Sequence, residues 1–558
     1  MGVLNRYKRW VEAVRDEELL TELTSITDDE AAIEDRFYRE LEFGTGGLRG
    51  VLGAGTNRIN IYTVAKATQG YLNYLRKSFP RPSVAIAYDS RIHSDLFART
   101  AAAVLAANGI QVHIYPKLMP TPALSFAVRD LNCSGGIVIT ASHNPAKYNG
   151  YKVYGPDGCQ ITTQAAKAIQ EEMGRVDPFA DVRWADFEDQ LARGTIFYIG
   201  EGTIKRYLQA VGTTSVLPAD IPRDATIVYT PLNGTGISCV PRCLEEHGFT
   251  NITIPEEQRN PDGNFPTCPY PNPEIREALT VGLDWAERTG SDLLLATDPD
   301  CDRVGAAVKT ADGYTLISGN EMGVLLLNFV CKMRRKNGTI PKAPVAVKTI
   351  VTTPMAAKIA KHYGVELVDV LTGFKFIGEQ IGLLEQRGEG NRYIFGFEES
   401  YGYLSGSFVR DKDAVNASLL ICEMFAYYKA QGKTLTDGLE ELYQTYGYYE
   451  SRLLSFQFEG SSGFAEMQDR MDALRKGPPA EIAGFPVENQ VDYLTEGTGL
   501  PKSNVLRYFL AGGMEATVRP SGTEPKLKIY LTAVGKDREA SHEIADKLSR
   551  YFEVWARA

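Results

Sequence analysis

The chain lacks most features that would place it in a membrane, outside the cell or on a nucleic acid. No apolar run is long enough to cross a membrane, and the segment Met1 to Glu18 is charged, without the apolar core of a signal peptide. The 8 cysteines are scattered, and the closest pair, Cys239 and Cys243, has no second pair to complete a zinc site. These absences predict a cytoplasmic protein with reduced thiols and no membrane partner.

An excess of positive charge is also missing. The chain has 60 Lys and Arg against 70 Asp and Glu, a net charge of -10, and no basic cluster with interleaved aromatic residues. This argues against nucleic-acid binding, so an anionic ligand must be held by a local positive site. What the chain does have is length, because 558 residues, 44% of them hydrophobic, suffice for several cores and roughly three to five domains.

Three stretches repeat one order of elements, strand-helix-strand-helix-strand, without a residue-level repeat. The predicted strands are residues 83–88, 111–115, 136–140, 225–229, 251–254, 292–296, 345–351, 365–368 and 393–397. The predicted helices between them are residues 95–107, 122–130, 236–247, 274–289, 354–363 and 378–387. Helices are also expected before residue 40 and as one long stretch over 414–444.

These patterns predict an α/β fold of three similar β-α-β-α-β units with mixed sheets, followed by a C-terminal α+β domain. Each unit places a polar loop after its last strand, and such loops could converge on one central cleft. The expected domains are residues 1–205, 206–318, 319–445 and 446–558.

The first of these loops carries a serine. The apolar run Ile137 to Ile139 ends at Thr140, and Ser142, His143 and Asn144 follow before a proline. In open α/β sheets this edge is where ligands bind. Taken alone, the pattern fits a simple cap of the next turn better than a catalytic serine.

Two other segments could hold an anion. Residues 43–50, Phe-Gly-Thr-Gly-Gly-Leu-Arg-Gly, place Arg49 among glycines, and Arg519-Pro-Ser-Gly-Thr523 combines an arginine with two hydroxyls and a glycine. For each, an ordinary turn is as good an interpretation as an anion site.

The second unit ends in three aspartates. Asp298, Asp300 and Asp302 alternate along a short loop and, if extended, would point to one side, where they repel unless a cation lies between them. Oxygen ligands favour Mg²⁺ or Ca²⁺ over zinc. An EF-hand is excluded, because Arg303 and Lys309 stand where the loop needs glycine and glutamate. A solvated turn fits poorly after the apolar strand, so the pattern favours a metal site.

A metal, a serine on a separate loop and an arginine loop together suggest phosphoryl transfer through a phosphoserine. Arg303, Lys152 and His143 could stabilise the transferring group or move protons. The polar loop of the third unit supplies Glu398 and Ser400.

Four motifs, in this order along nearly the whole chain, resemble the α-D-phosphohexomutase family. They are residues 140–145 (TASHNP), 298–303 (DPDCDR), 396–400 (GFEES) and 519–523 (RPSGT). Residues 43–49 with 58–60 are similar to the longer phosphoglucomutase branch, which also includes phosphopentomutases and glucose-1,6-bisphosphate synthases.

The resemblance implies four domains around a central cleft and a phosphoserine at Ser142. With the chemistry of the residues, this predicts four groups of site residues. The catalytic residues are Ser142, His143, Lys152 and Arg49. The Mg²⁺ ligands are Ser142, Asp298, Asp300 and Asp302. The substrate-binding residues are Arg303, Thr372, Gly373, Lys375, Glu398 and Ser400, and the phosphate-binding residues are Arg519, Ser521, Gly522 and Thr523. The division of acid and base roles among His143, Lys152, Lys375 and Arg49 stays open.

The expected reaction interconverts glucose 1-phosphate and glucose 6-phosphate through glucose 1,6-bisphosphate, in a monomer or homodimer whose partners are small sugar phosphates. Tyr401 and Gly402 stand where the shorter phosphomannomutase/phosphoglucomutase branch has Gly-His, which makes mannose a weaker expectation. Phosphopentomutase, phosphomannomutase and glucose-1,6-bisphosphate synthase remain rivals. A non-catalytic sugar-phosphate sensor would be expected to lose Ser142 or a metal aspartate, and the sequence keeps them.

Overall fold

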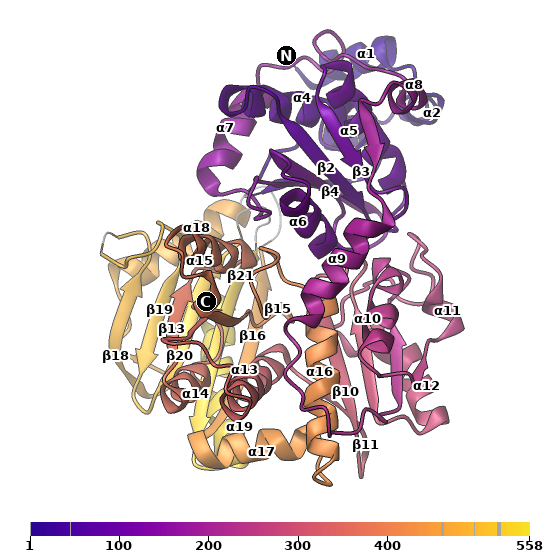
Figure 1. Ribbon diagram of the computed structural model, residues 1–558. Helices are drawn as coiled ribbons and strands as arrows, with labels where there is room; N and C mark the ends of the chain where they lie inside the picture. Colours follow the sequence, from indigo (N-terminus) through magenta and orange to yellow (C-terminus); the bar gives the residue numbers. More distant parts are fainter. Residues whose placement is uncertain (1, 45, 459–462, 496, 522–525, 558) are drawn as a thin grey trace.

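The computed structural model describes residues 2–44, 46–458, 463–495, 497–521 and 526–557. The described chain forms four β-sheets. The N-terminal sheet and its helices form the upper part of Figure 1, and the other three sheets lie below it. Within the described ranges, no helix has both the length and the apolar character needed to span a bilayer.

The first sheet has the strand order β1-β5-β4-β2-β3-β6. Strands β2, β3 and β4 are parallel and β5 runs antiparallel to β4, which confirms a mixed sheet. Its elements are β1 (Gly47–Val51), α4 (Ile61–Ser78), β2 (Ser83–Tyr88), α5 (Ser94–Ala107), β3 (Gln111–Ile114), α6 (Thr121–Asp130), β4 (Gly135–Ile139), β5 (Tyr148–Tyr154), α7 (Thr163–Met173), α8 (Phe187–Ala192) and β6 (Ile196–Tyr198). The glycine-rich segment is not a plain turn, because Arg49 lies in β1 opposite Gly150 of β5.

The second sheet has the order β11-β10-β9-β7-β8, with β7, β8 and β9 parallel. Its elements are α9 (Glu201–Gly212), β7 (Ile227–Thr230), α10 (Val240–Glu246), β8 (Ile252–Thr253), α11 (Glu256–Arg259), α12 (Thr280–Thr289), β9 (Leu293–Thr297), β10 (Val304–Thr310) and β11 (Gly313–Ile317). The helix predicted over 274–289 was too long, since Arg276–Leu279 is a 3-10 turn and α12 begins only at Thr280.

The third sheet has the order β13-β12-β14-β15. Its elements are α13 (Gly319–Lys336), β12 (Val345–Thr349), α14 (Met355–Tyr363), β13 (Glu366–Val370), α15 (Phe374–Gln386), β14 (Tyr393–Phe397), β15 (Tyr403–Leu404), α16 (Ala414–Lys429) and α17 (Leu435–Tyr446). The helical stretch predicted over 414–444 is present, but it is divided into α16 and α17. Gly432 adopts a φ of 69°, and Thr434 and Asp437 then form a capping box that starts α17.

The fourth sheet is antiparallel, in the order β16-β21-β20-β19-β18-β17, and matches the predicted C-terminal α+β unit. Its elements are β16 (Tyr448–Gln457), α18 (Gly463–Lys476), β17 (Glu481–Ile482), β18 (Phe485–Asp492), β19 (Leu506–Leu510), β20 (Met514–Pro520), β21 (Lys526–Gly535) and α19 (Arg538–Arg557). The expected N-terminal helices are α1 (Val3–Ala13), α2 (Glu17–Ser25) and α3 (Glu30–Phe37).

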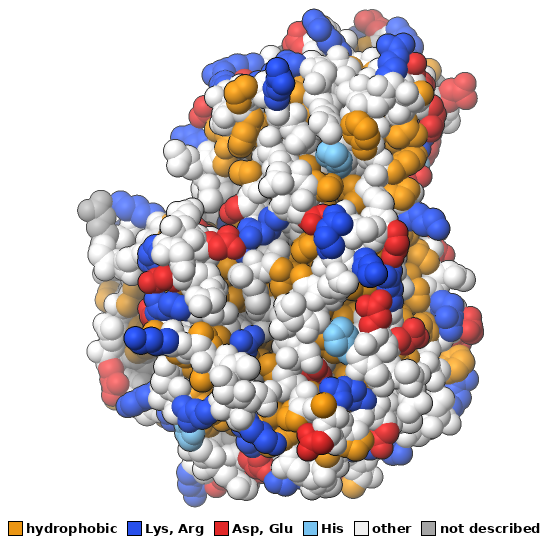
Figure 2. Space-filling view, viewed as in Figure 1, with side chains coloured by type: hydrophobic (Ala, Val, Ile, Leu, Met, Phe, Trp, Pro, Cys, Tyr) orange, Lys and Arg blue, Asp and Glu red, His pale blue; other side chains and the backbone are white. Residues whose placement is uncertain are grey.

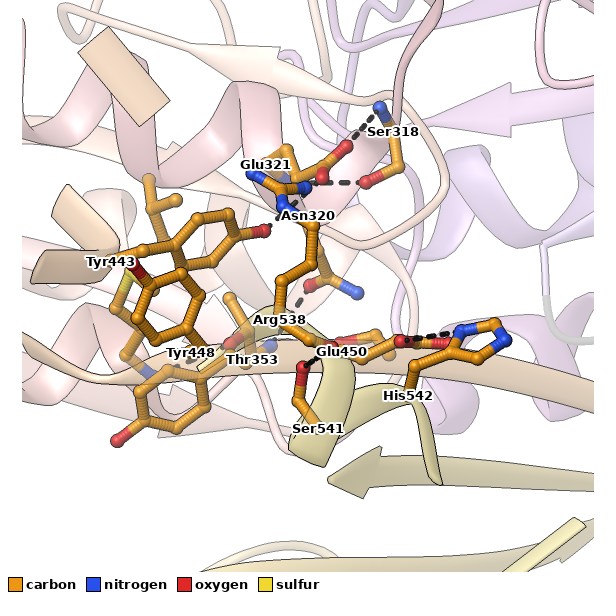
Figure 3. Close-up of a pocket in the computed structure, with 14 residues that line it drawn as sticks. Ser318, Asn320, Glu321, Thr353, Tyr443, Tyr448, Glu450, Arg538, Ser541 and His542 are labelled. Atoms are coloured by element: carbon orange, nitrogen blue, oxygen red, sulfur yellow. Dashed lines mark hydrogen bonds and ion pairs between the residues drawn. The ribbon is translucent and has the colours of Figure 1, made fainter. Parts of the chain in front are cut away.

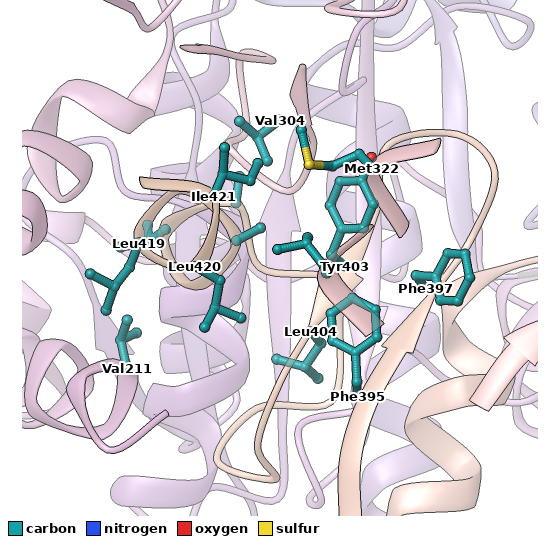
Figure 4. Close-up of a cluster of buried hydrophobic side chains, with 14 of the residues drawn as sticks. Val211, Val304, Met322, Phe395, Phe397, Tyr403, Leu404, Leu419, Leu420 and Ile421 are labelled. Carbon is teal, nitrogen blue, oxygen red and sulfur yellow. The ribbon is translucent and has the colours of Figure 1, made fainter. Parts of the chain in front are cut away.

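One buried apolar cluster runs through the first three units. It joins Val211 of α9, Val304 of β10 and Phe395 of β14 around α16, whose Leu420 is completely buried (Figure 4). The fourth unit has a separate core beneath its own sheet. Figure 2 shows a notch between the N-terminal part and this unit. A smaller buried cluster, which includes Ile350 of the third unit and Tyr530 of the fourth, joins these two units.

Candidate active site

Strand β4 is buried along its length and delivers Ser142 to the edge of the first sheet. Ser142 is 4% exposed and has a φ of 51°, a left-handed conformation that is costly for a residue other than glycine. Its backbone N–H donates to Thr140 Oγ1 at 2.8 Å. The serine is therefore held in a strained turn rather than serving as a helix cap.

Arg91, from the loop after β2, holds this turn from behind. Its guanidinium donates to four carbonyl oxygens of the serine loop, those of Ser142, Asn144, Pro145 and Tyr148. The Arg91 side chain is fully buried, and its Nε lies 3.4 Å from Asp89 Oδ2. Phe265, from the second unit, stacks on the guanidinium at 5.1 Å. The loop geometry thus depends on one buried cation.

We expect the Arg91→Met substitution to destabilise the first unit and lower kcat, because it leaves the Asp89 charge and four carbonyls unpaired. Breaking a buried pair in this way costs about 3–5 kcal/mol. Urea unfolding and steady-state kinetics measure the two effects. Arg99→Met is the matched control, since Arg99 of α5 is only partly buried, its side chain is 43% exposed, and it pairs with Glu188 at the surface. Equal stability and kcat in the two variants would contradict this role.

The three aspartates converge as predicted, although through a turn rather than an extended loop. Asp298, Asp300 and Asp302 each offer a carboxylate oxygen within 4.8 Å of the others, and all three are buried. Cys301 has a φ of 53°, and the N–H groups of Asp302 and Arg303 donate to Asp298 Oδ1. The turn therefore folds around one of its own carboxylates.

Two buried oxygens of this cluster, Oδ1 of Asp300 and Oδ1 of Asp302, have no hydrogen-bond partner among the described residues. Buried carboxylate oxygens without donors are costly, and a hard cation satisfies them directly. The donor set, oxygen only, fits Mg²⁺ or Ca²⁺. This observation, and not the acidic cluster alone, indicates that the residues can hold an ion.

Lysines compensate for the clustered negative charge. Lys152 Nζ lies 2.8 Å from Asp300 Oδ2 and 3.4 Å from Asp302 Oδ2, and Lys412 Nζ lies 2.8 Å from Asp302 Oδ2. Burial alone would raise the pKa of Asp300, yet Lys152 and Lys412 outweigh it and lower that pKa. Burial and the other two carboxylates raise the pKa of Asp298, which carries no lysine partner.

The serine and the metal loop meet directly. Ser142 Oγ donates to Asp298 Oδ2 at 2.9 Å, although 156 residues separate them. Thr121 Oγ1 donates to Asp300 Oδ2 at 2.9 Å, which fastens the first unit to the same loop. His143 Nδ1 lies 3.3 Å from Ser142 Oγ. Burial, with the charges of Arg303 and Arg49, lowers the pKa of His143, so the imidazole is neutral at neutral pH.

The loop after β14 borders this centre. Glu398 is 6% exposed, and burial raises its pKa to about 7 although Lys412 and Arg303 oppose the shift. Arg303 itself pairs with Glu274 at 2.7 Å. The backbone carbonyl of Tyr401 accepts a hydrogen bond from the backbone N–H of Val304 at 3.2 Å, so this loop is attached to the strand that follows the aspartate turn.

Other predicted residues lie further out. Lys375 lies in the first turn of α15, and its backbone carbonyl accepts a hydrogen bond from the thiol of Cys159 at 3.4 Å, which places the segment with Thr372 and Gly373 against the first unit. Ser521 N–H donates to Lys526 O, closing the loop after Arg519. Gly522 and Thr523 lie outside the described residues.

The fourth unit approaches the third at this point. Burial and Arg519 lower the pKa of Lys528 on β21, while Glu399 and Glu274 act in the opposite direction. Arg519 and Lys528 therefore lie within electrostatic reach of the loop that carries Glu398, and together they present positive charge to the centre.

Comparison with known proteins matches three consecutive segments to one family. Residues 40–178, 205–313 and 318–446 match alpha/beta/alpha domains I, II and III of phosphoglucomutase/phosphomannomutase. A phosphoglucomutase of Staphylococcus aureus (strain USA300) is 38% identical over 542 residues, covering 94% of each chain. The chain belongs to the phosphoglucomutase/phosphomannomutase family. This confirms the family resemblance drawn from the motifs.

Further relatives agree. A phosphoglucomutase of Staphylococcus haemolyticus is 37% identical over 512 residues, covering 89% of this chain and 91% of that protein. The open form of parafusin, a phosphoglucomutase from Paramecium, superposes with a TM-score of 0.70 at 19% identity, covering 93% and 95% of the two chains. The structure of a putative phosphomannomutase from Thermus thermophilus superposes with a TM-score of 0.68 at 23% identity, covering 92% of this chain and 99% of that chain. At these identities the two structures show that the fold is shared.

In this member of the phosphoglucomutase/phosphomannomutase family, sequence reasoning missed Lys412, Thr121 and Arg91. Lys412 sits in the charged run Arg410-Asp-Lys-Asp413, just before an apolar helix, and charges in that position could have signalled a buried site. Thr121 and Arg91 carry no such pattern, because their roles depend on contacts with distant loops.

Proposed function

We propose that the protein is a phosphoglucomutase that interconverts glucose 1-phosphate and glucose 6-phosphate through phospho-Ser142. One observation carries the proposal: Ser142 Oγ lies 2.9 Å from Asp298 Oδ2, so the candidate nucleophile touches the candidate metal site. The relatives that cover most of the chain are named phosphoglucomutase, which supports the same reaction.

We assign the ion to Mg²⁺, held by Asp298, Asp300, Asp302 and Ser142. When bound, Mg²⁺ would neutralise charge on the transferring phosphoryl group. Asp298 would exchange the Ser142 hydroxyl for the cation, which agrees with its lack of a lysine partner. Lys152 and Lys412 orient the other two carboxylates.

The chain's own residues then supply the remaining steps. Phospho-Ser142 transfers its phosphoryl group to the free hydroxyl of glucose 1-phosphate, forming a new P–O bond to the sugar and breaking the bond to Ser142 Oγ. Neutral His143, close to Ser142 Oγ, can exchange a proton with the reacting oxygens. The resulting glucose 1,6-bisphosphate turns over, and its other phosphate returns to Ser142, releasing glucose 6-phosphate.

The two phosphates are proposed to bind in different units. Arg303, Arg49 and Lys152 would serve the reacting phosphate, while Arg519 and Ser521, with Gly522 and Thr523, would hold the other. Domain boundaries at 205/206, 318/319 and 445/446 place these groups on separate bodies. Closure of the fourth domain over the substrate would exclude water from the phosphoserine.

Glu398 and Ser400 are proposed to bind neighbouring hydroxyls of a six-membered ring, with Thr372, Gly373 and Lys375 on the sugar face. Gly402 stands where the mannose-directed branch has a histidine, and a Cβ there would lie 2.6 Å from Lys412 Cδ and 2.9 Å from Glu398 Oε1, so both side chains would have to move from their present positions. This supports glucose over mannose. We also propose that the protein is cytoplasmic and is a monomer or a homodimer.

The test is an activity panel with glucose, mannose, ribose and glucosamine 1-phosphates. We expect glucose 1-phosphate to give the highest kcat/KM, because buried polar groups discriminate strongly against a substrate that leaves them unpaired. A preference for ribose 1-phosphate would identify a phosphopentomutase instead. Accumulation of bisphosphate from a separate phosphoryl donor would identify a glucose-1,6-bisphosphate synthase.

Glu398→Gln should lower kcat/KM for glucose 1-phosphate while leaving the unfolding temperature nearly unchanged, because the amide keeps the shape but replaces one acceptor oxygen by a donor and cannot ionise. Removing one charge-assisted hydrogen bond costs about 1.5–3 kcal/mol, or roughly 10–150-fold in kcat/KM. Glu366→Gln is the control, since Glu366 is an exposed residue of β13. An unchanged kcat/KM in Glu398→Gln would remove this residue from the sugar site.

A further inference from the structure

A cavity of about 360 Å³ lies away from the metal aspartates, where the fourth unit joins the third. One wall comes from α13 and α17 of the third unit, through Asn320, Glu321 and Tyr443. The opposite wall comes from β16 and α19 of the fourth, through Glu450 and Arg538 (Figure 3). The cavity is therefore a joint between two units.

The chain crosses between the two units beside this cavity, at Gly447. This residue has a φ of 104°, which only glycine adopts without strain, and it directly joins α17 to β16. Tyr443 and Tyr448, on either side of it, both line the cavity and stack with their ring centroids 5.4 Å apart. A change in the angle between the units at Gly447 must change the shape of the cavity.

The acidic side chains of the cavity are already occupied by protein donors. Glu321 accepts the Tyr443 hydroxyl and the Ser318 N–H, and Glu450 pairs with Arg452 and His542. The oxygens of both carboxylates therefore have hydrogen-bond donors within the protein, and Glu450 also has the positive charge of Arg452 beside it.

In contrast to the carboxylates, two side chains of the cavity, Arg538 and Asn320, have hydrogen-bond donors that could bind a ligand. The Arg538 guanidinium lies over the ring of Tyr443, 5.3 Å from the ring centroid. Its Nη2 donates a hydrogen bond to Glu440 Oε2 at 3.1 Å. Within the described chain, its Nε and Nη1 have no hydrogen-bond acceptor. That pair is largely exposed and contributes little, so it can yield to a stronger anion. Asn320 Oδ1 accepts the Thr353 N–H at 2.9 Å, which leaves its Nδ2 without a partner among the residues described.

We propose that this joint cavity binds a small phosphate ester. The Arg538 guanidinium offers the planar fork that phosphate oxygens match, Asn320 adds an amide donor from the opposite unit, and the tyrosines supply an apolar wall for the organic part. A ligand held by both walls fixes the angle at Gly447. Occupancy therefore slows movement of the fourth unit and lowers kcat without competing for the substrate site.

The test uses phenyl phosphate as the probe, titrated calorimetrically into Mg²⁺-treated protein without any sugar phosphate, because a sugar phosphate would itself compete for the cavity. We expect one binding event, weakened at least about tenfold in Arg538→Ala and in Asn320→Ala. Lys536→Ala is the matched control, because Lys536 is an exposed cation two residues before Arg538. Arg538→Ala without probe should keep the wild-type kcat.

Kinetics give the second measurement. In the wild type, phenyl phosphate should lower kcat even at saturating substrate, whereas in Arg538→Ala it should raise only the apparent KM. Equal affinity in the wild type and both variants, or purely competitive inhibition of the wild type, would overturn the proposal. The binding comparison does not depend on which sugar phosphate is turned over, so a wrong substrate assignment is distinguishable from a wrong cavity assignment.

Discussion

Ser142→Ala should abolish mutase activity and remove the phosphate that a fraction of the wild-type molecules carries. The alanine cannot form the covalent intermediate, and loss of such a nucleophile lowers kcat at least about 10⁴-fold. The fold should survive, because the hydroxyl makes only side-chain bonds to Asp298 and His143. Intact-protein mass spectrometry after incubation with glucose 1,6-bisphosphate measures the phosphate, and a coupled assay measures kcat.

Ser78→Ala is the matched control, since Ser78 is an exposed residue at the end of α4. It should keep both the phosphate and the activity. Phosphate that remains on the Ser142→Ala variant, together with retained activity, would rule out the covalent route through this serine. Loss of phosphate with retained activity would separate the modification from the reaction.

Asp300→Asn should weaken Mg²⁺ binding and slow turnover by about 3–5 kcal/mol, or roughly 10²–10⁴-fold. The substitution removes a ligand charge and leaves a single acceptor oxygen, which cannot serve both the metal side and the side held by Lys152 and Thr121, so the neighbouring groups are less well oriented. Calorimetric Mg²⁺ titration and the metal-induced shift in Tm measure the first effect, and kcat measures the second.

Asp284→Asn, on the exposed face of α12, is the control and should match the wild type. Because Lys152 already lowers the pKa of Asp300, the aspartate is charged at neutral pH and its loss is a full unit of charge. Activity that persists in a chelator, or an unchanged Mg²⁺ affinity in Asp300→Asn, would exclude the metal assignment.

Local sequence patterns located most of the regular structure. Buried parallel strands such as Ile137–Ile139 and Leu293–Ala296 are continuous apolar runs, so their positions, and the loops that follow them, can be seen without any tertiary information. The apolar pattern did not show the interruption between α16 and α17, where Gly432 and Thr434 end one helix and start the next. At residues 43–50 the glycines left a turn and an anion site as equal alternatives, and neither included the strand β1 that forms by pairing with β5.

The sequence by itself determined the types of residue at the site and their order: a serine after one strand, three aspartates after another, a glutamate after a third. It also determined the family, because four such motifs in order are specific. Only the tertiary structure decided that Ser142 meets Asp298, that Lys152 and Lys412 neutralise the aspartates, and that Arg91 holds the serine loop. The residues that these contacts join lie between 51 and 156 positions apart in the sequence. Long-range contacts depend on how whole sheets pack around the shared core, and no local pattern records that packing.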